Sequence, residues 1–392
     1  MTAQVRISQS LANKIGVAAR DRSPIVGYTH NFYRYPARFS PKFAAAAIEC
    51  FSKPGDLVCE PYMGGGTAVV QALVMGRHVV GNDLNSLSSF ITKVKVTPLN
   101  RTEINAVMAW AENVVPTLTY WRSRRPLTRH LSAPETKNLG LVRGRFIKKV
   151  IAAGLASLGE LPTRDAQDFV RCVLLRVSQW ALDGRETHTS LAEFRDKLSS
   201  DTVQMLAGLE SFVDALESHK MRPRSYLNTG DAGDIDKMAI FAQQGRRARL
   251  AVSSPPYPGV HVLYHRWQVD GRRETPAPYW IAGRKDGEGS AFYNFGDRRE
   301  QGTITYFSNS LRTLRAIRNT LADDGVIVQM VAFGDPQTQL PLYLKNMEEA
   351  GFRELSASGK RIWRQVPHRK WHAALQKKTS SSKEVVLIHR AG

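Results

Sequence analysis

Two prolines and a tyrosine follow a short apolar run in the second half of the chain. The run covers residues 250–252, and the chain then reads Ser254-Pro255-Pro256-Tyr257. Because proline has no backbone N–H to donate, a strand that ends in two prolines must leave the sheet there. Open α/β folds bind their ligands at the carboxyl edge of the sheet. The pattern therefore predicts a hydroxyl, a carbonyl and an aromatic ring at a ligand-binding edge, with the ring free to stack on a planar group.

A glycine-rich turn lies far upstream, between an expected strand at 56–60 and an expected helix at 67–75. A second expected strand, 78–82, ends next to Asp83, which follows Gly64 by 19 residues. In dinucleotide-type sites the glycines let the backbone approach the ligand, and an acid about 20 residues later accepts hydrogen bonds from ribose hydroxyls. Here Glu60 and Pro61 precede the glycines and no phosphate-binding pattern completes the turn. This favours a ribose-containing cofactor without a pyrophosphate.

Together, the S-P-P-Y and E-P-x-x-G-x-G-T motifs resemble those of the DNA methyltransferases that modify exocyclic amino groups, N4 of cytosine or N6 of adenine. The resemblance covers roughly residues 28–98 and 225–390. It implies an α/β fold with a doubly wound, seven-stranded, Rossmann-like methyltransferase sheet whose last strand runs antiparallel, and S-adenosylmethionine as cofactor. Further strands are expected at 226–229, 250–252, 326–331 and 383–389, with helices at 306–321 and 340–350.

The resemblance also implies which residues bind the cofactor. The Pro-Ala-Arg-Phe segment would line its methionine end, and Asp83 would contact the ribose. We favour Asp231 over Asp234 for the adenine, since Asp234 could equally cap the following helix. Glu60 replaces the usual aspartate of the family. The expected cofactor residues are Tyr35, Pro36, Ala37, Phe39, Glu60, Pro61, Tyr62, Gly64, Gly66, Thr67, Asp83 and Asp231.

Exocyclic amines are poor nucleophiles because their lone pair is delocalised into the ring. We expect the Ser254 hydroxyl and the Pro255 carbonyl to accept the two N–H bonds while Tyr257 stacks on the base. Pro256 completes the expected catalytic turn. The base must leave the duplex stack, at a cost of a few kcal/mol. Serine at the first position is, within the family, more typical of N4-cytosine enzymes, with N6-adenine as the alternative.

Composition favours a nucleic-acid partner. Fifty-five Lys and Arg against 35 Asp and Glu give a formal charge of +20, which suits a polyanion, here double-stranded DNA. No run of about 18 apolar residues and no signal-peptide core is found, so we expect a cytoplasmic protein without a membrane partner. The cysteines Cys50, Cys59 and Cys172 have no metal-ligand or disulfide spacing, so no metal is expected. None follows a proline, as the nucleophile of cytosine C5 methylation does.

Four segments are expected: a basic N-terminal arm at 1–27, a cofactor-binding half at 28–98, a helical insertion at 99–222, and a catalytic half at 223–392. The insertion could serve DNA recognition or oligomerisation. Within the last segment, the loop 258–302 mixes aromatic residues with arginine, a composition that stacks bases and grips phosphate. A folded motif closing the core is the alternative for this loop. The expected DNA-binding residues are Tyr264, His265, Arg266, Trp267, Arg272, Arg273, Arg298 and Arg299.

Several alternatives stay open. The target-recognition region falls either to 99–222 or to 258–302. An RNA methyltransferase would share the core and the charge, although no RRM or KH signature is present. A non-catalytic DNA-binding subunit would lose the cofactor site, which is intact here. The sequence also leaves open a homodimer and a companion restriction endonuclease.

Overall fold

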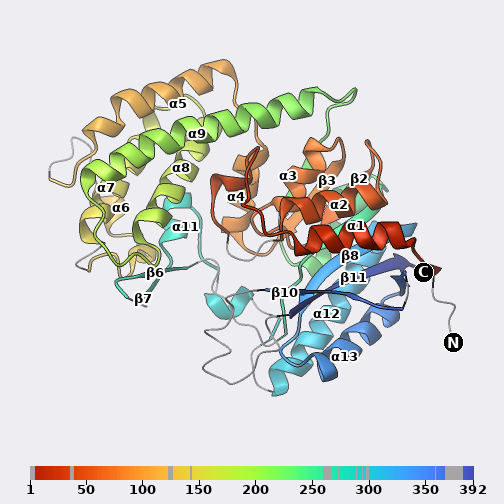
Figure 1. Ribbon diagram of the computed structural model, residues 1–392. Coiled ribbons are helices and arrows are strands. Elements are labelled where there is room, and N and C mark those ends of the chain that lie inside the picture. The colour runs from red at the N-terminus through yellow and green to blue at the C-terminus, as the bar shows by residue number, and fades with distance from the viewer. Residues whose placement is uncertain are drawn as a thin grey trace.

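The computed structural model describes residues 5–35, 39–121, 127–141, 144–258, 266–271, 273–287, 289–293, 295–296, 300–357, 359–366 and 383–392. A mixed α/β part and a helical part lie side by side (Figure 1). None of the helices in these ranges is long and apolar enough to cross a membrane.

In the described ranges a nine-stranded sheet forms the centre of the α/β part, in the order β1-β9-β11-β8-β5-β2-β3-β4, with β10 also paired to β11. Strands β8, β5, β2, β3 and β4 are parallel to one another, and β11 runs antiparallel between β8 and β9. The seven strands from β9 to β4 confirm the doubly wound methyltransferase sheet with one antiparallel strand, while β1, β9 and β10 lie outside the strand ranges expected from the sequence. The strands are β1 (Val5–Arg6), β2 (Leu57–Glu60), β3 (His78–Asp83), β4 (Ser225–Thr229), β5 (Ala248–Ser253), β8 (Leu321–Ala332), β9 (Phe352–Ser356), β10 (Ile362–Gln365) and β11 (Lys383–Ala391).

Two apolar clusters cover the two faces of the sheet. Because side chains alternate along a strand, Val58 of β2 packs into one cluster and its neighbours Leu57 and Cys59 pack into the other. Strands buried on both faces explain the continuous apolar runs in the sequence. The first cluster contains α1 (Gln9–Arg20), α2 (Pro41–Phe51), α3 (Thr67–Val74) and α4 (Ser86–Val96), and the second contains α10 (Ala239–Ala242), α12 (Glu300–Thr320) and α13 (Pro336–Glu349).

The N-terminal arm was wrongly predicted for residues 9–20. These residues form α1, whose start is capped by the Ser8 side chain. Ile15 and Ala19 are fully buried, and α1 packs against α2 and β10. The apolar spacing of this helix outweighs its basic residues, because burying one face stabilises a helix regardless of the charges on the other.

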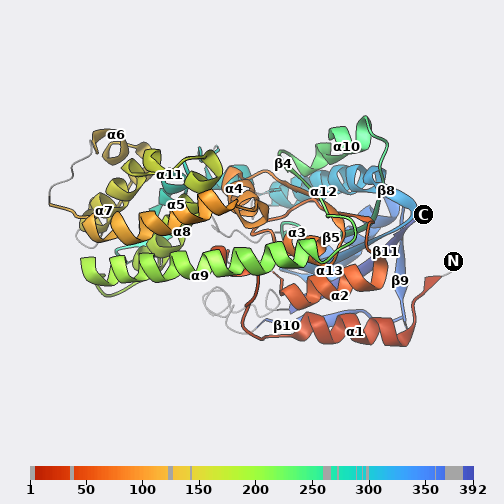
Figure 2. The same ribbon diagram turned by 90° about the horizontal axis from the view of Figure 1, so that it is seen from above.

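All the secondary-structure elements in the described residues of the insertion are helices, as expected. Capping boxes at Asn100 with Glu103 and at Ser190 with Glu193 begin its first and last long helices. The last of these, α9, extends from the helical part to α3 of the α/β part (Figure 2). The helices are α5 (Arg101–Asn113), η2 (Val115–Thr117), α6 (Thr128–Leu131), η3 (Pro134–Thr136), α7 (Arg145–Ala156), η4 (Leu158–Glu160), α8 (Arg164–Leu182) and α9 (Leu191–Glu217).

Much of the expected long loop is folded. Residues 266–287 contain the antiparallel hairpin β6 (Trp267–Val269) with β7 (Arg273–Thr275), followed by α11 (Ala277–Ala282), and η6 (Ser290–Tyr293) comes later. The Asn138 amide donates to the Glu274 carbonyl at 2.8 Å, and Arg171 donates to the Ile281 carbonyl at 3.1 Å. The alternative of a folded motif is therefore confirmed for this stretch. In the described residues, β6 and α11 of this stretch pack against α8 of the insertion.

Candidate active site

The S-P-P-Y turn leaves the sheet directly after β5, as the double proline predicted. The Ser254 hydroxyl oxygen lies 3.1 Å from that of Tyr257. The Tyr257 hydroxyl in turn donates to Oε1 of Glu384 at 2.9 Å, and Tyr306 of α12 donates to the Pro256 carbonyl at 2.8 Å. The Tyr257 ring is partly exposed and packs against the second apolar cluster. Its hydroxyl is thus anchored, while the stacking role of the ring stays a prediction.

The glycine turn is held by α4. Gly64 and Gly66 have φ of 47° and 74°, in the left-handed region that favours glycine. A Cβ on Gly66 would lie 2.6 Å from Oγ1 of Thr92. Buried Lys95 donates to the Gly65 carbonyl at 2.6 Å, and Ser88 donates to the Gly64 carbonyl. The sequence analysis missed these supporting residues, because their spacing shows only that they share one face of a helix and not what that face contacts.

Asp83 lies at the carboxyl end of β3, against this turn. Its Oδ2 accepts from the Gly64 N–H and its Oδ1 accepts from the Asn85 N–H, both at 2.8 Å. The residue is partly exposed, and burial raises the pKa of its carboxyl. Each carboxylate oxygen has two lone pairs. The geometry therefore leaves acceptor capacity for the hydroxyls of a ribose.

Glu60 ends the neighbouring strand β2 and is 1% exposed. Its Oε1 accepts from the Tyr62 N–H at 3.2 Å. Burial, with Asp83 as a smaller contribution, raises the pKa of Glu60 well above its usual value. Two carboxyls at one edge raise the local preference for a cation. A sulfonium cofactor, which carries a positive charge, fits this pair.

Tyr35 packs behind the glycine turn. It is 6% exposed, and a Cβ on Gly65 would lie 2.8 Å from the Tyr35 Cβ. Phe39 instead packs edge-on against Phe43 of α2, with ring centroids 5.4 Å apart. The structure thus brings Tyr35 to the turn and places Phe39 in the core. The expected residues Pro36 and Ala37 lie outside the described residues.

The other expected residues of the turn also lie at this edge. Tyr62 stands edge-on to Phe295 with centroids 5.9 Å apart, and burial raises its pKa well above the usual value. Pro61 is buried, and Thr67 is the first residue of α3 and 5% exposed. Of these residues, Tyr62 packs against the second apolar cluster, which contains α12.

Asp231 is engaged by protein groups. Its Oδ1 accepts from the Gly233 N–H at 2.8 Å, which caps η5 (Ala232–Lys237), and its Oδ2 pairs with Arg312 of α12. Asp234, the residue expected to act as a cap, pairs instead with Lys237. Sequence reasoning missed Arg312, which lies far along the chain. The role of Asp231 toward adenine therefore remains a prediction.

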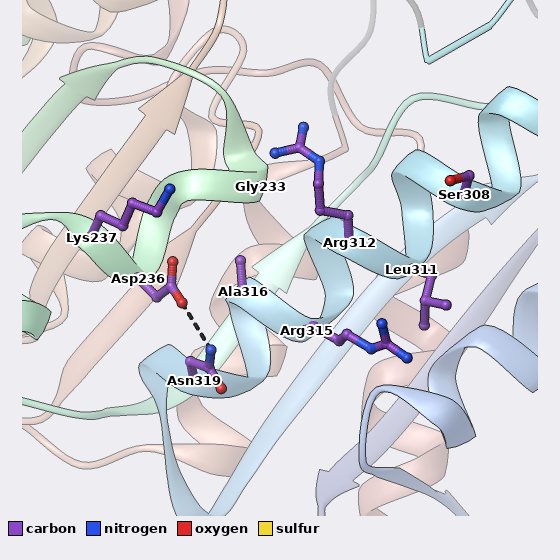
Figure 3. A pocket seen from close by; sticks show the side chains of 9 residues that line it. All are labelled: Gly233, Asp236, Lys237, Ser308, Leu311, Arg312, Arg315, Ala316 and Asn319. Carbon is purple, nitrogen blue, oxygen red and sulfur yellow. Dashed lines mark hydrogen bonds between the residues drawn. The ribbon is translucent and has the colours of Figure 1, made fainter.

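A shallow pocket of about 350 Å³ lies between η5 and α12, next to this ion pair. Figure 3 shows basic side chains from both elements around it, with Asp236 hydrogen-bonded to Asn319. Its walls are Gly233, Asp236, Lys237, Ser308, Leu311, Arg312, Arg315, Ala316 and Asn319. Ser254 and Tyr257 are not among them, so this pocket is distinct from the amine site.

The expected DNA-binding residues divide into three groups. Trp267 was wrongly assigned: it is 1% exposed and its indole N–H donates to the Tyr33 hydroxyl at 2.9 Å. Arg266 pairs with Asp286, while Arg273 is exposed on β7. The indole is buried because the hairpin packs into the first apolar cluster. Tyr264, His265, Arg272, Arg298 and Arg299 lie outside the described residues.

The cysteines have no reactive character. Burial raises the pKa of Cys59 and of Cys172 to about 12, and raises that of Cys50 as well. A thiol with a raised pKa is a poor nucleophile. Among the described residues, no group of three or more His, Cys, Asp or Glu is placed to hold a metal ion.

Comparisons with known proteins agree with the family that the two motifs resemble. Residues 15–89 match the model of the DNA methylase family. The type II methyltransferase M.MvaI of Kocuria varians is 30% identical over 122 residues, which cover 28% of this chain and 27% of the relative. M.MjaII of Methanocaldococcus jannaschii is 29% identical over 69 residues, 18% of this chain and 13% of the relative. The chain therefore matches about a quarter or less of the length of each.

Solved structures give only distant likeness. TrmN from Thermus thermophilus is 11% identical, with a TM-score of 0.35 over 93% of this chain and 52% of that chain. The rRNA methyltransferase aviRa from Streptomyces viridochromogenes is 10% identical, with a TM-score of 0.32 over 95% of this chain and 90% of that chain. Scores this low carry no argument about the substrate.

The matched residues 15–89 contain the glycine turn, Glu60 and Asp83, and the strand that follows them in the sheet carries the S-P-P-Y turn. On these grounds residues 15–89 are similar to the amino-methylating DNA methyltransferases, a likeness that supports S-adenosylmethionine as the cofactor.

Proposed function

We propose that the protein transfers a methyl group to an exocyclic amine of a base in double-stranded DNA, N4 of cytosine, in a restriction-modification system. The pairing of β2 with β5 is the observation that carries this proposal. Val58 and Cys59 pair in parallel with Leu250 and Ala251, so the glycine turn and the S-P-P-Y turn leave adjacent strands at the same edge. Adjacent strands lie about 4.8 Å apart. A methyl donor at one turn is therefore within reach of an amine at the other.

The roles of the side chains follow from this arrangement. Bound S-adenosylmethionine supplies an electrophilic methyl group. Asp83 places negative charge at the edge that would hold the cationic cofactor, and the neighbouring Glu60 carboxyl would ionise more readily beside that cation. Ser254 and the Pro255 carbonyl accept the amine N–H bonds and turn the nitrogen lone pair toward the methyl group. The partly exposed Tyr257 ring offers a stacking surface. Most of the rate then comes from orientation rather than from a strong base.

Cytosine N4 is favoured by Ser254 at the first position of the turn, where the resembling N6-adenine enzymes more often have aspartate or asparagine. Both M.MvaI and M.MjaII are named type II methyltransferases, which supports a modification role beside a companion endonuclease. The runner-up is N6 of adenine, which the same geometry would serve.

Target recognition falls to the body formed by the helical part and the β6–β7 hairpin. Exposed Arg273 lies on this hairpin, and the net charge of +20 favours contact with the phosphate backbone. The hairpin connects in the chain to the S-P-P-Y turn. DNA held by this body would therefore be close to the amine site.

The test is methyl transfer from labelled S-adenosylmethionine to mixed-sequence duplex DNA and to total RNA, with nucleoside mass spectrometry of the products. We expect N4-methylcytosine in DNA. N6-methyladenine would keep the chemistry and correct the base. Label in RNA alone, or no label in either nucleic acid, would contradict the proposal.

A further inference from the structure

A buried ion pair lies behind the S-P-P-Y turn. Arg364 of β10 and Glu384 of β11 stand directly opposite each other in the antiparallel register. Arg364 Nε donates to Oε2 of Glu384 at 2.5 Å, and Glu384 is 1% exposed. The guanidinium thus occupies one carboxylate oxygen, while the other, Oε1, faces Tyr257.

The number of protons available determines which group donates in the hydrogen bond between Tyr257 and Glu384. An ionised carboxylate can only accept hydrogen bonds, whereas a phenol has a single proton to donate. The 2.9 Å contact between Tyr257 and Glu384 therefore uses the Tyr257 proton. In the neighbouring 3.1 Å contact, Tyr257 must accept and Ser254 must donate. The Ser254 oxygen is left with lone pairs alone to offer to a bound base.

We propose that Glu384 is a positioning residue, which sets the direction of the Ser254–Tyr257 hydrogen bonds so that Ser254 presents an acceptor to the amine. The inference rests on the proposed function and adds the basis of its substrate choice. A base with an amino group donates to Ser254. A base with a carbonyl at that place would bring acceptor against acceptor and leave both without a hydrogen bond. The site thus selects amino bases over keto bases through a residue that does not touch the base.

Glu384→Gln tests the direction while keeping the shape. Because Arg364 attracts the single amide oxygen, the amide NH₂ turns to Tyr257 and donates to it. The Tyr257 proton then points to Ser254, and the Ser254 proton points at the amine. We expect kcat to fall about 10- to 100-fold, the factor for one misdirected hydrogen bond, with unchanged affinity for S-adenosylmethionine.

Ser254→Ala, made in the wild type and in Glu384→Gln, distinguishes a Glu384 that sets the hydrogen-bond direction from one that only supports the fold. In the wild type this change removes a useful acceptor and should lower kcat. In Glu384→Gln it removes a misdirected donor, so kcat should stay the same or rise. A Glu384 that only supports the fold predicts the same factor for Ser254→Ala in both backgrounds. That equality would overturn the inference.

Glu354→Gln is the matched control. Glu354 pairs with Arg361 at 2.6 Å near the same strands, and the change removes the same charge without contact to the S-P-P-Y turn. We expect wild-type kcat for this variant. A loss equal to that of Glu384→Gln would show that charge near β11, rather than hydrogen-bond direction, sets the rate, and would refute the inference.

A spectroscopic measurement keeps the inference testable without turnover. Resonance Raman difference spectra against Tyr257→Phe isolate the Tyr257 phenol. We expect a donor in the wild type and an acceptor in Glu384→Gln. A donor in both proteins would overturn the inference even if methyl transfer is confirmed, whereas the reversal would support it even if the substrate of the wild type proves to be another amine.

Discussion

Asp83→Asn is the most direct perturbation of the cofactor half. The two carboxylate oxygens of Asp83 accept from the N–H groups of Gly64 and Asn85, each at 2.8 Å. Asparagine has one oxygen and can keep only one of these bonds, so its NH₂ group faces the other N–H. One contact holds the glycine turn and the other holds the start of α4. Whichever is lost, a backbone donor at the site edge loses its partner.

The two effects have different sizes and different readouts. A partly buried donor without a partner costs about 1–3 kcal/mol of folding stability. The ribose separately loses a charged acceptor, and hydrogen bonds to charged groups contribute about 1.5–3 kcal/mol. We therefore expect the dissociation constant for S-adenosylmethionine to rise about 10- to 100-fold.

Calorimetric titration with S-adenosylmethionine, at a temperature where each variant is folded, measures the second effect alone. Asp324→Asn is the matched control, because it removes the same charge from an exposed pair with Arg249. Exposed pairs contribute less than about 1 kcal/mol, and this one lies at the start of β8, the opposite edge of the sheet. Equal affinities of the two variants would refute the ribose role of Asp83.

Two further predictions concern stability, and a third concerns cofactor binding. Because the pKa of Glu60 is raised, wild-type stability should fall as pH rises from about 4.5 toward the raised pKa, so the advantage of Glu60→Gln should grow over that range in thermal unfolding. The pH dependence due to His389 has the opposite sign, because burial lowers the pKa of this residue to about 4. The wild type should therefore lose about 3 kcal/mol of folding stability as pH falls from 6.5 to 4. His389→Phe should remove that loss. Gly66→Ala should abolish measurable cofactor binding, because Gly66 has a φ of 74° and an added Cβ would lie 2.6 Å from Oγ1 of Thr92. Adding Thr92→Ala removes the close contact but not the backbone strain, so it should recover only part of the affinity. Full recovery would show that the φ strain is negligible.

The cofactor half was predictable because its elements are local in sequence. An apolar strand, a glycine turn, a helix and a second strand ending in Asp83 follow one another within 30 residues, and each has its own pattern. The doubly wound sheet that contains them was expected from the family resemblance. The structure confirms these elements within a residue or two of the expected bounds.

The supporting contacts were not predictable, because they join distant segments. Glu384 lies 127 residues from Tyr257, and β10, which carries its partner Arg364, has no strong strand pattern. Trp267 shows the converse error. Aromatic residues among arginines suit base stacking, yet the same composition suits a small hairpin that must bury its rings. Composition alone does not distinguish the two, whereas burial does.

The structure divides the site between two supports. The glycine turn rests on α4, through Thr92 and Lys95, and its helix α3 packs in the first apolar cluster. The S-P-P-Y turn rests on β11 and α12, through Glu384 and Tyr306, in the second cluster. The β2–β5 pairing joins the two turns. Because each turn has its own supports on opposite faces of the sheet, the methyl donor site and the amine site can vary separately while the strand pairing keeps the distance between them. Under the proposed function, a change of target base would therefore be made in the S-P-P-Y half, with Glu384 behind it, without a change in the cofactor half.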